Sequence, residues 1–335
     1  MRSNEYERGD ILKVSVVIPT FNRPKQVLAS LYALRWQTMP ADQFEVIAVN
    51  DGSHVSYADI ETEETPFRFT LLEQENQGAA VARNTGAAYG QGDVLLFLDD
   101  DIRLRRNTLQ QLYDRCIALD NTIVLGALVT PNSLLTSPYA QINHKHVDHE
   151  VVTSEAALRP VSYTHTMTKI MMIPRMLFET SGGFQDPAGG RLYWDDVDFG
   201  YRAHRAGVRI MRCHSAVAEH WDDGLADWQT AARRAERASE LAIKLFERHP
   251  ALERQLLMFE DKRPIQLGED LPGLMARKVA RRVMAFRPIQ STLEWVTNSA
   301  EKRFPNPYLL EPLYRWIIGG YIYKGYQTAL REAAR

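Results

Sequence analysis

The segment LLFLDDDIRL, residues 95–104, places three aspartates directly after an apolar run. The preceding residues have the uninterrupted apolar character of a strand that is buried on both faces of a sheet. Adjacent carboxylates repel one another and have low propensity for both helix and strand. The chain therefore has either an acidic turn open to solvent or a site that uses this concentration of negative charge.

Strand and helix patterns alternate around this segment. Short apolar runs predict strands, and apolar residues at helical spacing predict helices. Strands are predicted at 13–19, 44–49, 67–73, 93–99, 121–130, 168–174 and 208–213, and helices at 24–37, 78–90 and 194–207. This alternation predicts an α/β fold with a mostly parallel central sheet flanked by helices. From about residue 224 onward the pattern is helical.

Ligands of such sheets bind at the carboxyl ends of the strands. Asn50-Asp51 and Asp99–Asp101 both fall there. Two carboxylates at a strand end can hold Mg²⁺ or Mn²⁺, and such ions often share their oxygen ligands with phosphates. A solvated acidic turn, or a cap for the helix that starts near Asn107, is the alternative.

Composition excludes several classes of protein. The 335-residue chain has a formal net charge of −2, without the basic excess of a general nucleic-acid binder. Cys116 and Cys213 are too few for a disulfide framework or a four-cysteine zinc site. We expect a cytoplasmic protein, or one at the cytoplasmic face of a membrane, because the polar N-terminus lacks a signal peptide and no apolar run approaches a bilayer span. The chain contains neither GxxxxGK[ST] nor a GxGxxG after its first strand, which argues against P-loop and dinucleotide enzymes.

The order of the remaining motifs resembles family 2 glycosyltransferases with the GT-A fold. The resemblance rests on VSVVIPTFNRP, VNDGS, ENQGAAVARNTG, DVLLFLDDD, SGGFQ and YWDDVDFGYRAHRAG, in this order over residues 13–222. It implies inverting transfer of a sugar from a nucleotide-sugar. The QxxRW element of polymerising members does not follow the acidic helix, so we expect a non-processive enzyme.

The resemblance also implies residue roles. Pro19, Thr20 and Phe21 would line the base and ribose, Asp51 would accept a hydrogen bond from the base, commonly uracil, and Gly78 and Arg83 would lie near the base and diphosphate. Asp99, Asp100 and Asp101 correspond to the DXD element. Asp101 is the first choice for a ligand of Mn²⁺ or Mg²⁺. Asp99 is expected to contact the ribose and also to bind the metal, and Asp100 is expected to contact the nucleotide-sugar donor. His220 matches a histidine that approaches the metal in some members, and Asp196 matches the catalytic base. The chain departs from the family pattern at Asn50 and Asp195, where Asp and Glu are usual.

Structural roles compete with some of these assignments. Asp195 can serve as a helix N-cap and Asp198 as a partner of the helix dipole. Arg202 is expected to pair with a carboxylate, and His220 can be a packed histidine. His144, His146 and His149 alternate as on a strand face, and we interpret them as surface or acceptor-side residues rather than a zinc site. Cys213 is expected to be a buried structural cysteine.

The predicted organisation is a catalytic domain over residues 1–223, with a nucleotide-sugar half at 13–101 and an acceptor half at 102–223, and a mainly helical region at 224–335. In LMARKVARRVMAF, the cations Arg277, Lys278, Arg281 and Arg282 stand among apolar residues, a pattern compatible with an anionic membrane surface. We favour packing of this region on the catalytic domain, or on a second subunit in a homodimer, because amphipathic helices commonly pack in this way.

The sequence thus predicts a metal-dependent inverting glycosyltransferase that uses a nucleotide-sugar, a UDP-sugar by preference. The acceptor would be a hydroxyl of a glycan, a lipid-linked saccharide or a small molecule. A nucleotidyltransferase of similar fold is an alternative, although its glycine-rich first loop is missing from TFNRPK. A non-catalytic module that binds a sugar or a nucleotide is the alternative from a different class.

Overall fold

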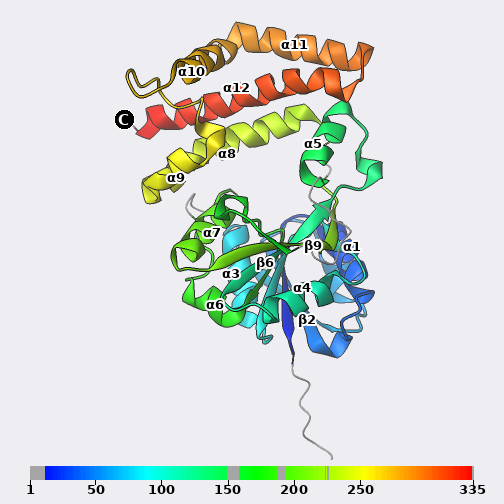
Figure 1. The fold of residues 1–335 in the computed structure, drawn as a ribbon. Helices are drawn as coiled ribbons and strands as arrows, with labels where there is room; N and C mark the ends of the chain where they lie inside the picture. The colour runs from blue at the N-terminus through cyan, green and yellow to red at the C-terminus, as the bar shows by residue number, and fades with distance from the viewer. Residues whose placement is uncertain (1–11, 149–157, 187–192, 223, 225, 334–335) are drawn as a thin grey trace, which may run out of the picture. The chain divides into compact units, whose positions relative to one another are not determined.

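The computed structural model describes residues 12–148, 158–186, 193–222, 224 and 226–333. Contacts between Cα atoms divide the chain into two units (Figure 1). Unit 1 comprises Met1–Val129, Glu150–Asp186 and Gly190–His220, and unit 2 comprises Thr130–His149, Pro187–Gly189 and Trp221–Arg335.

Unit 1 is an α/β sandwich. Its main elements are β1 (Val14–Thr20), α1 (Pro24–Arg35), β2 (Phe44–Asp51), α2 (Ala58–Glu61), β3 (Arg68–Gln74), α3 (Ala79–Tyr89), β4 (Val94–Leu98), β5 (Ile102–Leu104), α4 (Thr108–Ile117), β6 (Thr122–Val129), β7 (Leu158–Pro160), β8 (Ile170–Pro174), α6 (Arg175–Thr180), α7 (Asp195–Arg205) and β9 (Arg209–His220). The predicted alternation of strands and helices is therefore present.

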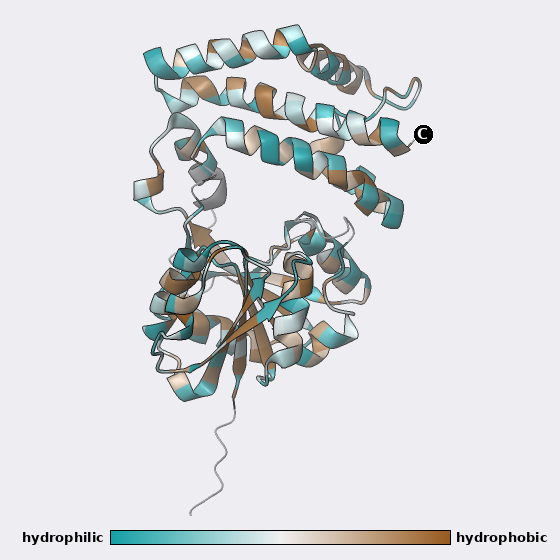
Figure 2. Ribbon diagram, turned by 180° about the vertical axis from the view of Figure 1, so that it is seen from behind, coloured by the Kyte–Doolittle hydropathy of each residue, from teal (hydrophilic) through white to brown (hydrophobic). Residues whose placement is uncertain are grey.

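Within the described residues, nine strands form one sheet. Eight follow the order β3-β2-β1-β4-β8-β6-β9-β5, and β7 pairs with β9. The pairs among β3, β2, β1 and β4 are parallel, β6 pairs with β9 in parallel, and the remaining pairs are antiparallel. Figure 2 shows the strands mostly in brown, as expected for a sheet that is covered on its faces. Because β1, β2 and β4 run in parallel, their carboxyl ends share one edge.

Close packing fixes α3 against this sheet. A Cβ atom on Gly86 would lie 2.4 Å from Cγ1 of Val17 in β1, so only glycine lets the helix approach the strand this closely. On the same side, the rings of Phe97, Phe178, Phe184 and Phe199 form an aromatic cluster with centroid separations of 4.8–5.6 Å. Helix α3 and the SGGFQ segment, which contributes Phe184, are therefore anchored to one core.

Unit 2 is helical. It contains α5 (Pro138–Asp148), α8 (Trp228–Arg248), α9 (Pro250–Gln255), α10 (Pro272–Met284), α11 (Arg287–Arg303) and α12 (Pro307–Ala333). Its core is formed by Tyr139, Ile142, Trp228, Leu310, Tyr314 and Ile317. Among the residues that the structure describes, none of the helices combines the length and the apolar character of a bilayer span.

One expectation from the sequence is wrong in unit 2. His144 and His146 lie on α5, so they do not alternate along a strand face, and His149 lies outside the described residues. The cations of α10 are divided between the interior and the surface: Lys278 and Arg281 are buried and pair with Asp270 and Asp261, whereas Arg277 and Arg282 are exposed. Neither interior contact is visible in a local sequence pattern.

Candidate functional site

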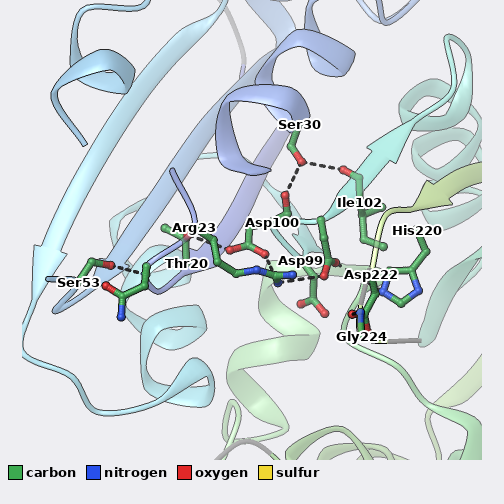
Figure 3. Close-up of polar contacts among 12 residues, drawn as sticks. Thr20, Arg23, Ser30, Ser53, Asp99, Asp100, Ile102, His220, Asp222 and Gly224 are labelled. Carbon is green, nitrogen blue, oxygen red and sulfur yellow. Dashed lines mark hydrogen bonds and ion pairs between the residues drawn. The ribbon is translucent and has the colours of Figure 1, made fainter. Parts of the chain in front are cut away.

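The aspartate run begins where β4 ends, and Asp100 is its most enclosed member. The Thr20 hydroxyl, at the end of β1, donates to Oδ2 of Asp100 at 2.8 Å, and Arg23 donates to Oδ1 at 2.8 Å (Figure 3). The Ser30 hydroxyl of α1 donates to the Asp100 backbone carbonyl. Burial raises the pKa of Asp100 to about 7, against the opposing effect of the Arg23 guanidinium. The carboxylate of Asp100 thus faces the first loop of the chain.

Asp101 lies between Arg23 and His220. Arg23 donates to its Oδ2 at 3.0 Å, and Nε2 of His220, the last residue of β9, lies 3.6 Å from its Oδ1. The side chains of Asp101 and His220 are buried. Asp101 and His220 therefore bring a carboxylate oxygen and an imidazole nitrogen close together.

Arg83 of α3 connects the two acidic segments. Its guanidinium donates to Oδ1 of Asp99 at 2.7 Å and to Oδ2 of Asp195 at 2.7 Å. Burial alone would lower the pKa of Arg83, but these two carboxylates outweigh burial and raise it. Burial works against ionisation of Asp99 as well, yet Arg83 holds the pKa of Asp99 below its usual range. The pair is therefore ionised on both sides.

Helix α7 begins at the second acidic segment. Trp194 directly precedes it with φ 72°, a left-handed backbone conformation that is costly for a bulky residue. This turn brings Asp195 and Asp196 to the helix start, where the backbone N–H of Val197 donates to Oδ1 of Asp196 at 2.8 Å. Burial raises the pKa of Asp196 to about 7, and the neighbouring Asp195 adds to the rise. A carboxyl group with this pKa can accept a proton near neutral pH.

The other acidic residue of α7 has a structural role. Asp198 is fully buried and accepts a hydrogen bond from Nε of Arg202 at 2.8 Å, which confirms the expected pairing of Arg202 with a carboxylate. Arg202 also donates to the carbonyl of Gly183 in the SGGFQ segment. The N-cap position belongs to Trp194, so the alternative that made Asp195 the N-cap is wrong. Arg202 thus links the SGGFQ segment to Asp198 of α7.

Asp51 organises the turn after β2. Its Oδ1 accepts hydrogen bonds from Gln74 at 2.7 Å and from the backbone N–H of Gln77 at 2.9 Å, and its Oδ2 accepts one from Gly78 at 2.8 Å. Gly78 has φ 92°, which favours glycine. Asp51 therefore anchors the loop that leads into α3 and Arg83.

The structure does not gather every residue of the expected site in this network. Pro19 is a buried strand residue opposite Val49. Phe21 is exposed, and its ring forms a T-shaped pair with that of His54 at a centroid separation of 6.1 Å. Cys213 is buried, as expected.

Three participants were not named from the sequence. Arg23 pairs with Asp100 and Asp101, and Lys169, just before β8, is close enough to lower the pKa of both Asp99 and Asp196. Asn84 exchanges two hydrogen bonds with the backbone of Phe184. The position of Arg23 in TFNRPK, directly after the first predicted strand, was a local signal that could have identified it. No local sequence pattern identifies Lys169.

The donor set of the site suits a cation that takes part of its ligands from elsewhere. Within the described part of the chain, no three His, Cys, Asp or Glu side chains are grouped so that they could hold a metal ion. Asp101 and His220 supply one oxygen and one nitrogen. A Mg²⁺ or Mn²⁺ ion commonly binds one or two protein side chains and completes its shell with phosphate oxygens and water. The residues therefore fit a cation that binds together with a diphosphate.

A family model described as glycosyl transferase family 2 matches residues 15–181, which include β1 through α6 and the aspartate run. The chain belongs to glycosyltransferase family 2. An uncharacterized glycosyltransferase of Haemophilus influenzae is 43% identical over 89 residues, 26% of this chain and 29% of that protein. Glycosyltransferase AglE of Haloferax volcanii is 34% identical over 218 residues, 62% of this chain and 66% of that protein. The alignments thus cover less than two thirds of either relative.

A solved structure gives the same fold. Mannosyltransferase PcManGT from Pyrobaculum calidifontis, in complex with GDP-Man and Mn²⁺, matches with a TM-score of 0.59 and 19% identity, over 96% of this chain and 87% of that chain. This likeness confirms the GT-A fold that was expected for this family 2 member.

Proposed function

We propose that this chain transfers a sugar from a UDP-sugar to an acceptor hydroxyl, with inversion at the anomeric carbon. The observation that carries the proposal is the double ion pair of Arg83. It joins Asp99, on the donor side, to Asp195, the neighbour of the proposed base, with 2.7 Å on each side. The positive charge of Arg83 lies between the two segments and reduces the electrostatic repulsion between the negatively charged donor and the carboxylate of the proposed base.

The donor would bind at the shared edge of β1, β2 and β4. Pro19, Thr20, Phe21, Asp51 and Gly78 are proposed to surround the base and ribose, and Arg83, Asp99 and Asp100 to contact the ribose and diphosphate. Asp51 already anchors the loop before α3. We propose a double role for Asp51, holding this loop and accepting a hydrogen bond from the base.

Asp101 and His220 are the proposed ligands of a divalent cation, Mn²⁺ or Mg²⁺. When bound, such an ion neutralises the charge that develops on the departing diphosphate. Mn²⁺ in the PcManGT complex supports this choice, since that protein has the same fold. Arg23 adds a fixed positive charge on the other side of Asp101.

Asp196 is the proposed general base. It would take the proton of the acceptor hydroxyl while the hydroxyl oxygen forms a bond to the anomeric carbon and the bond from that carbon to the diphosphate breaks. The products are the glycoside, the nucleoside diphosphate and a protonated Asp196. The pKa of about 7 supports this role because the group is available as a base near neutral pH.

The test combines a donor panel with one isosteric variant. UDP-sugars and GDP-sugars are offered with Mn²⁺ and a mixture of acceptors, and NMR of the product reports the anomeric configuration. Asp196→Asn is expected to lower transfer by about a hundredfold or more. Glu179→Gln, an exposed carboxylate of α6, serves as the matched control and is expected to keep full activity.

Each contrary result has a distinct meaning. Wild-type transfer by Asp196→Asn would remove Asp196 from the mechanism, and a product of retained configuration would exclude inversion. Transfer from GDP-sugars alone would overturn the UDP preference. Nucleotide-sugar binding without turnover on any acceptor would point to a binding module.

A further inference from the structure

Two of the four cations of helix α10, Lys278 and Arg281, face inward. Lys278 and Arg281 are 5% and 8% exposed. Lys278 donates to Asp270 at 2.6 Å and to the Pro264 carbonyl at 2.9 Å, and Arg281 pairs with Asp261 at 3.0 Å. A surface helix normally turns its apolar side to the core and its charges to water. The two buried cations of α10 depart from this arrangement, whereas Arg277 and Arg282 remain exposed.

The apolar side of α10 faces outward as a consequence. Val279, Val283 and Phe286 follow one another at helical spacing and are 50%, 46% and 63% exposed. Burying ion pairs is costly, and exposing valine and phenylalanine forfeits hydrophobic stabilisation. The loss of hydrophobic stabilisation is recovered when another surface covers these exposed apolar side chains.

The start of α11 continues this apolar surface. A groove of about 390 Å³ is lined by Met284, Pro288, Ile289, Thr292, Leu293 and Val296. Ile289 and Val296 are themselves exposed. We call Val279, Val283, Phe286, Ile289 and Val296 the α10–α11 face.

The charges around this face are positive. Arg282 and Arg287 are exposed beside it. Helix α10 contains no carboxylate, and the two carboxylates of α11, Glu294 and Glu301, accept hydrogen bonds from Tyr321 and Tyr314 of α12. The rim of the face therefore carries cations without nearby exposed carboxylates on the same two helices.

A cationic cavity adjoins the same corner. Between α11 and α12, Arg287, Lys324 and Arg331 are among the residues that line a cavity of about 580 Å³. Lys324 also pairs with Glu236, while Arg287 lies next to the groove at the start of α11. The corner thus combines an apolar surface with positive charge that suits phosphate groups.

We propose that the α10–α11 face docks on an anionic membrane surface. Apolar side chains entering the acyl boundary, with arginines at the phosphate level, are the physical basis of peripheral membrane binding. A second copy of the chain is disfavoured, because a two-fold interface would bring the same cationic rims together. The proposal stands independently of the sugar transfer proposed above.

Vesicle cosedimentation of the full chain tests it, with phosphatidylcholine vesicles with and without phosphatidylglycerol. Binding is expected only with the anionic lipid, and added salt should weaken it. The double variants Val283→Ser/Phe286→Ser and Arg282→Gln/Arg287→Gln are each expected to weaken binding about tenfold or more. All four positions are exposed, so folding should not suffer.

Matched controls alter exposed residues elsewhere. Arg106→Gln/Arg254→Gln removes the same charge, and Trp36→Ser removes a large exposed side chain from unit 1; both are expected to bind vesicles like the unaltered chain. Equal loss of binding in Arg106→Gln/Arg254→Gln would show that vesicle binding depends only on the net charge of the protein, and would contradict the α10–α11 face as the binding site. Absence of vesicle binding, or a dimer in light scattering that Val283→Ser/Phe286→Ser dissociates, would overturn the membrane as the occupant.

Discussion

Arg83 binds Asp99 and Asp195 through its two terminal nitrogens, each at 2.7 Å. One buried guanidinium thereby fixes the distance between the aspartate run after β4 and the start of α7. A planar, forked cation is suited to this because it can donate to two carboxylates in fixed directions. The geometry of the proposed donor site and of the proposed base consequently depends on one residue of α3.

Replacing Arg83 should separate charge from geometry. Arg83→Met leaves Asp99 and Asp195 buried without their cation, and we expect it to destabilise the fold by about 3–5 kcal/mol. Arg83→Lys keeps the charge but cannot bridge both carboxylates, so it should fold better than Arg83→Met and still lose most transfer activity. Urea unfolding and transfer assays measure the two effects. Arg68→Lys, at an exposed position, is the control, and equal behaviour of Arg68→Lys and Arg83→Lys would contradict the bridging role.

The pH dependence of transfer should report Asp196. Its pKa is raised to about 7, and a base must be deprotonated to accept a proton, so kcat/KM should fall as pH drops below about 7 and level off above it. Arg83 lowers this pKa, so Arg83→Met should move the acid limb to higher pH in whatever fraction remains folded. Residual activity of Asp196→Asn should lack this limb, and an unchanged limb in that variant would assign it to another group.

Removal of His220 should weaken metal binding. If His220 and Asp101 share a cation, His220→Ala should raise the Kd for Mn²⁺ in the presence of nucleoside diphosphate by about tenfold or more. The Mn²⁺ electron paramagnetic resonance signal measures this directly, without an activity assay. His204→Ala removes an exposed histidine of α7 and should leave the Kd unchanged. Equal affinities in wild type and His220→Ala would show that His220 is a packed histidine only.

The contact of α8 with α12 in unit 2 should not tolerate a methyl group. A Cβ atom on Gly325 would lie 2.2 Å from the backbone carbonyl of Glu236, which cannot rotate away. Gly325→Ala should therefore lower the free energy of unfolding by about 1–3 kcal/mol. A Cβ atom on Gly273 meets nothing within 4 Å, so Gly273→Ala is the control and should be neutral or stabilising by about 0.5–1 kcal/mol. Thermal unfolding of both variants decides the point, and equal stabilities would mean that the helices can shift apart.

Much of the fold could be predicted from the sequence because its signals are local. Apolar runs predicted β1, β2, β3, β4, β6 and β8 within a few residues, together with the start of β9, which continues to His220 beyond the predicted 208–213. The short strands β5 and β7 were not predicted. Turn residues and the family resemblance located Asp51, the aspartate run and Asp196. Helix α5 was missed because PYAQINHKHVD has a weak apolar pattern, and alternating histidines resemble a strand face.

The site could be predicted less completely, since long-range pairing decides its electrostatics. Sequence placed Asp99, Asp100 and Asp101 at one strand end without distinguishing their partners. In the structure, Asp99 pairs with Arg83, and Asp100 contacts Thr20 and Arg23. Asp101 contacts Arg23 and His220. These partners come from α3, from the end of β1 and the loop that follows it, and from β9, which approach one another only when the sheet forms.

By itself, the sequence determined which residues are apolar, where the chain turns and where negative charge accumulates. Those properties belong to neighbouring residues, and they suffice for strands, helices and motifs. Only the tertiary structure decided which carboxylate keeps its charge and which side of α10 faces outward. Charge depends on burial and on cations from distant segments, and the orientation of a helix depends on where its partners lie. Asp99 illustrates the first effect, because its charge is stabilised by Arg83 from another helix. Lys278 illustrates the second, because it faces inward to pair with Asp270, which lies outside α10.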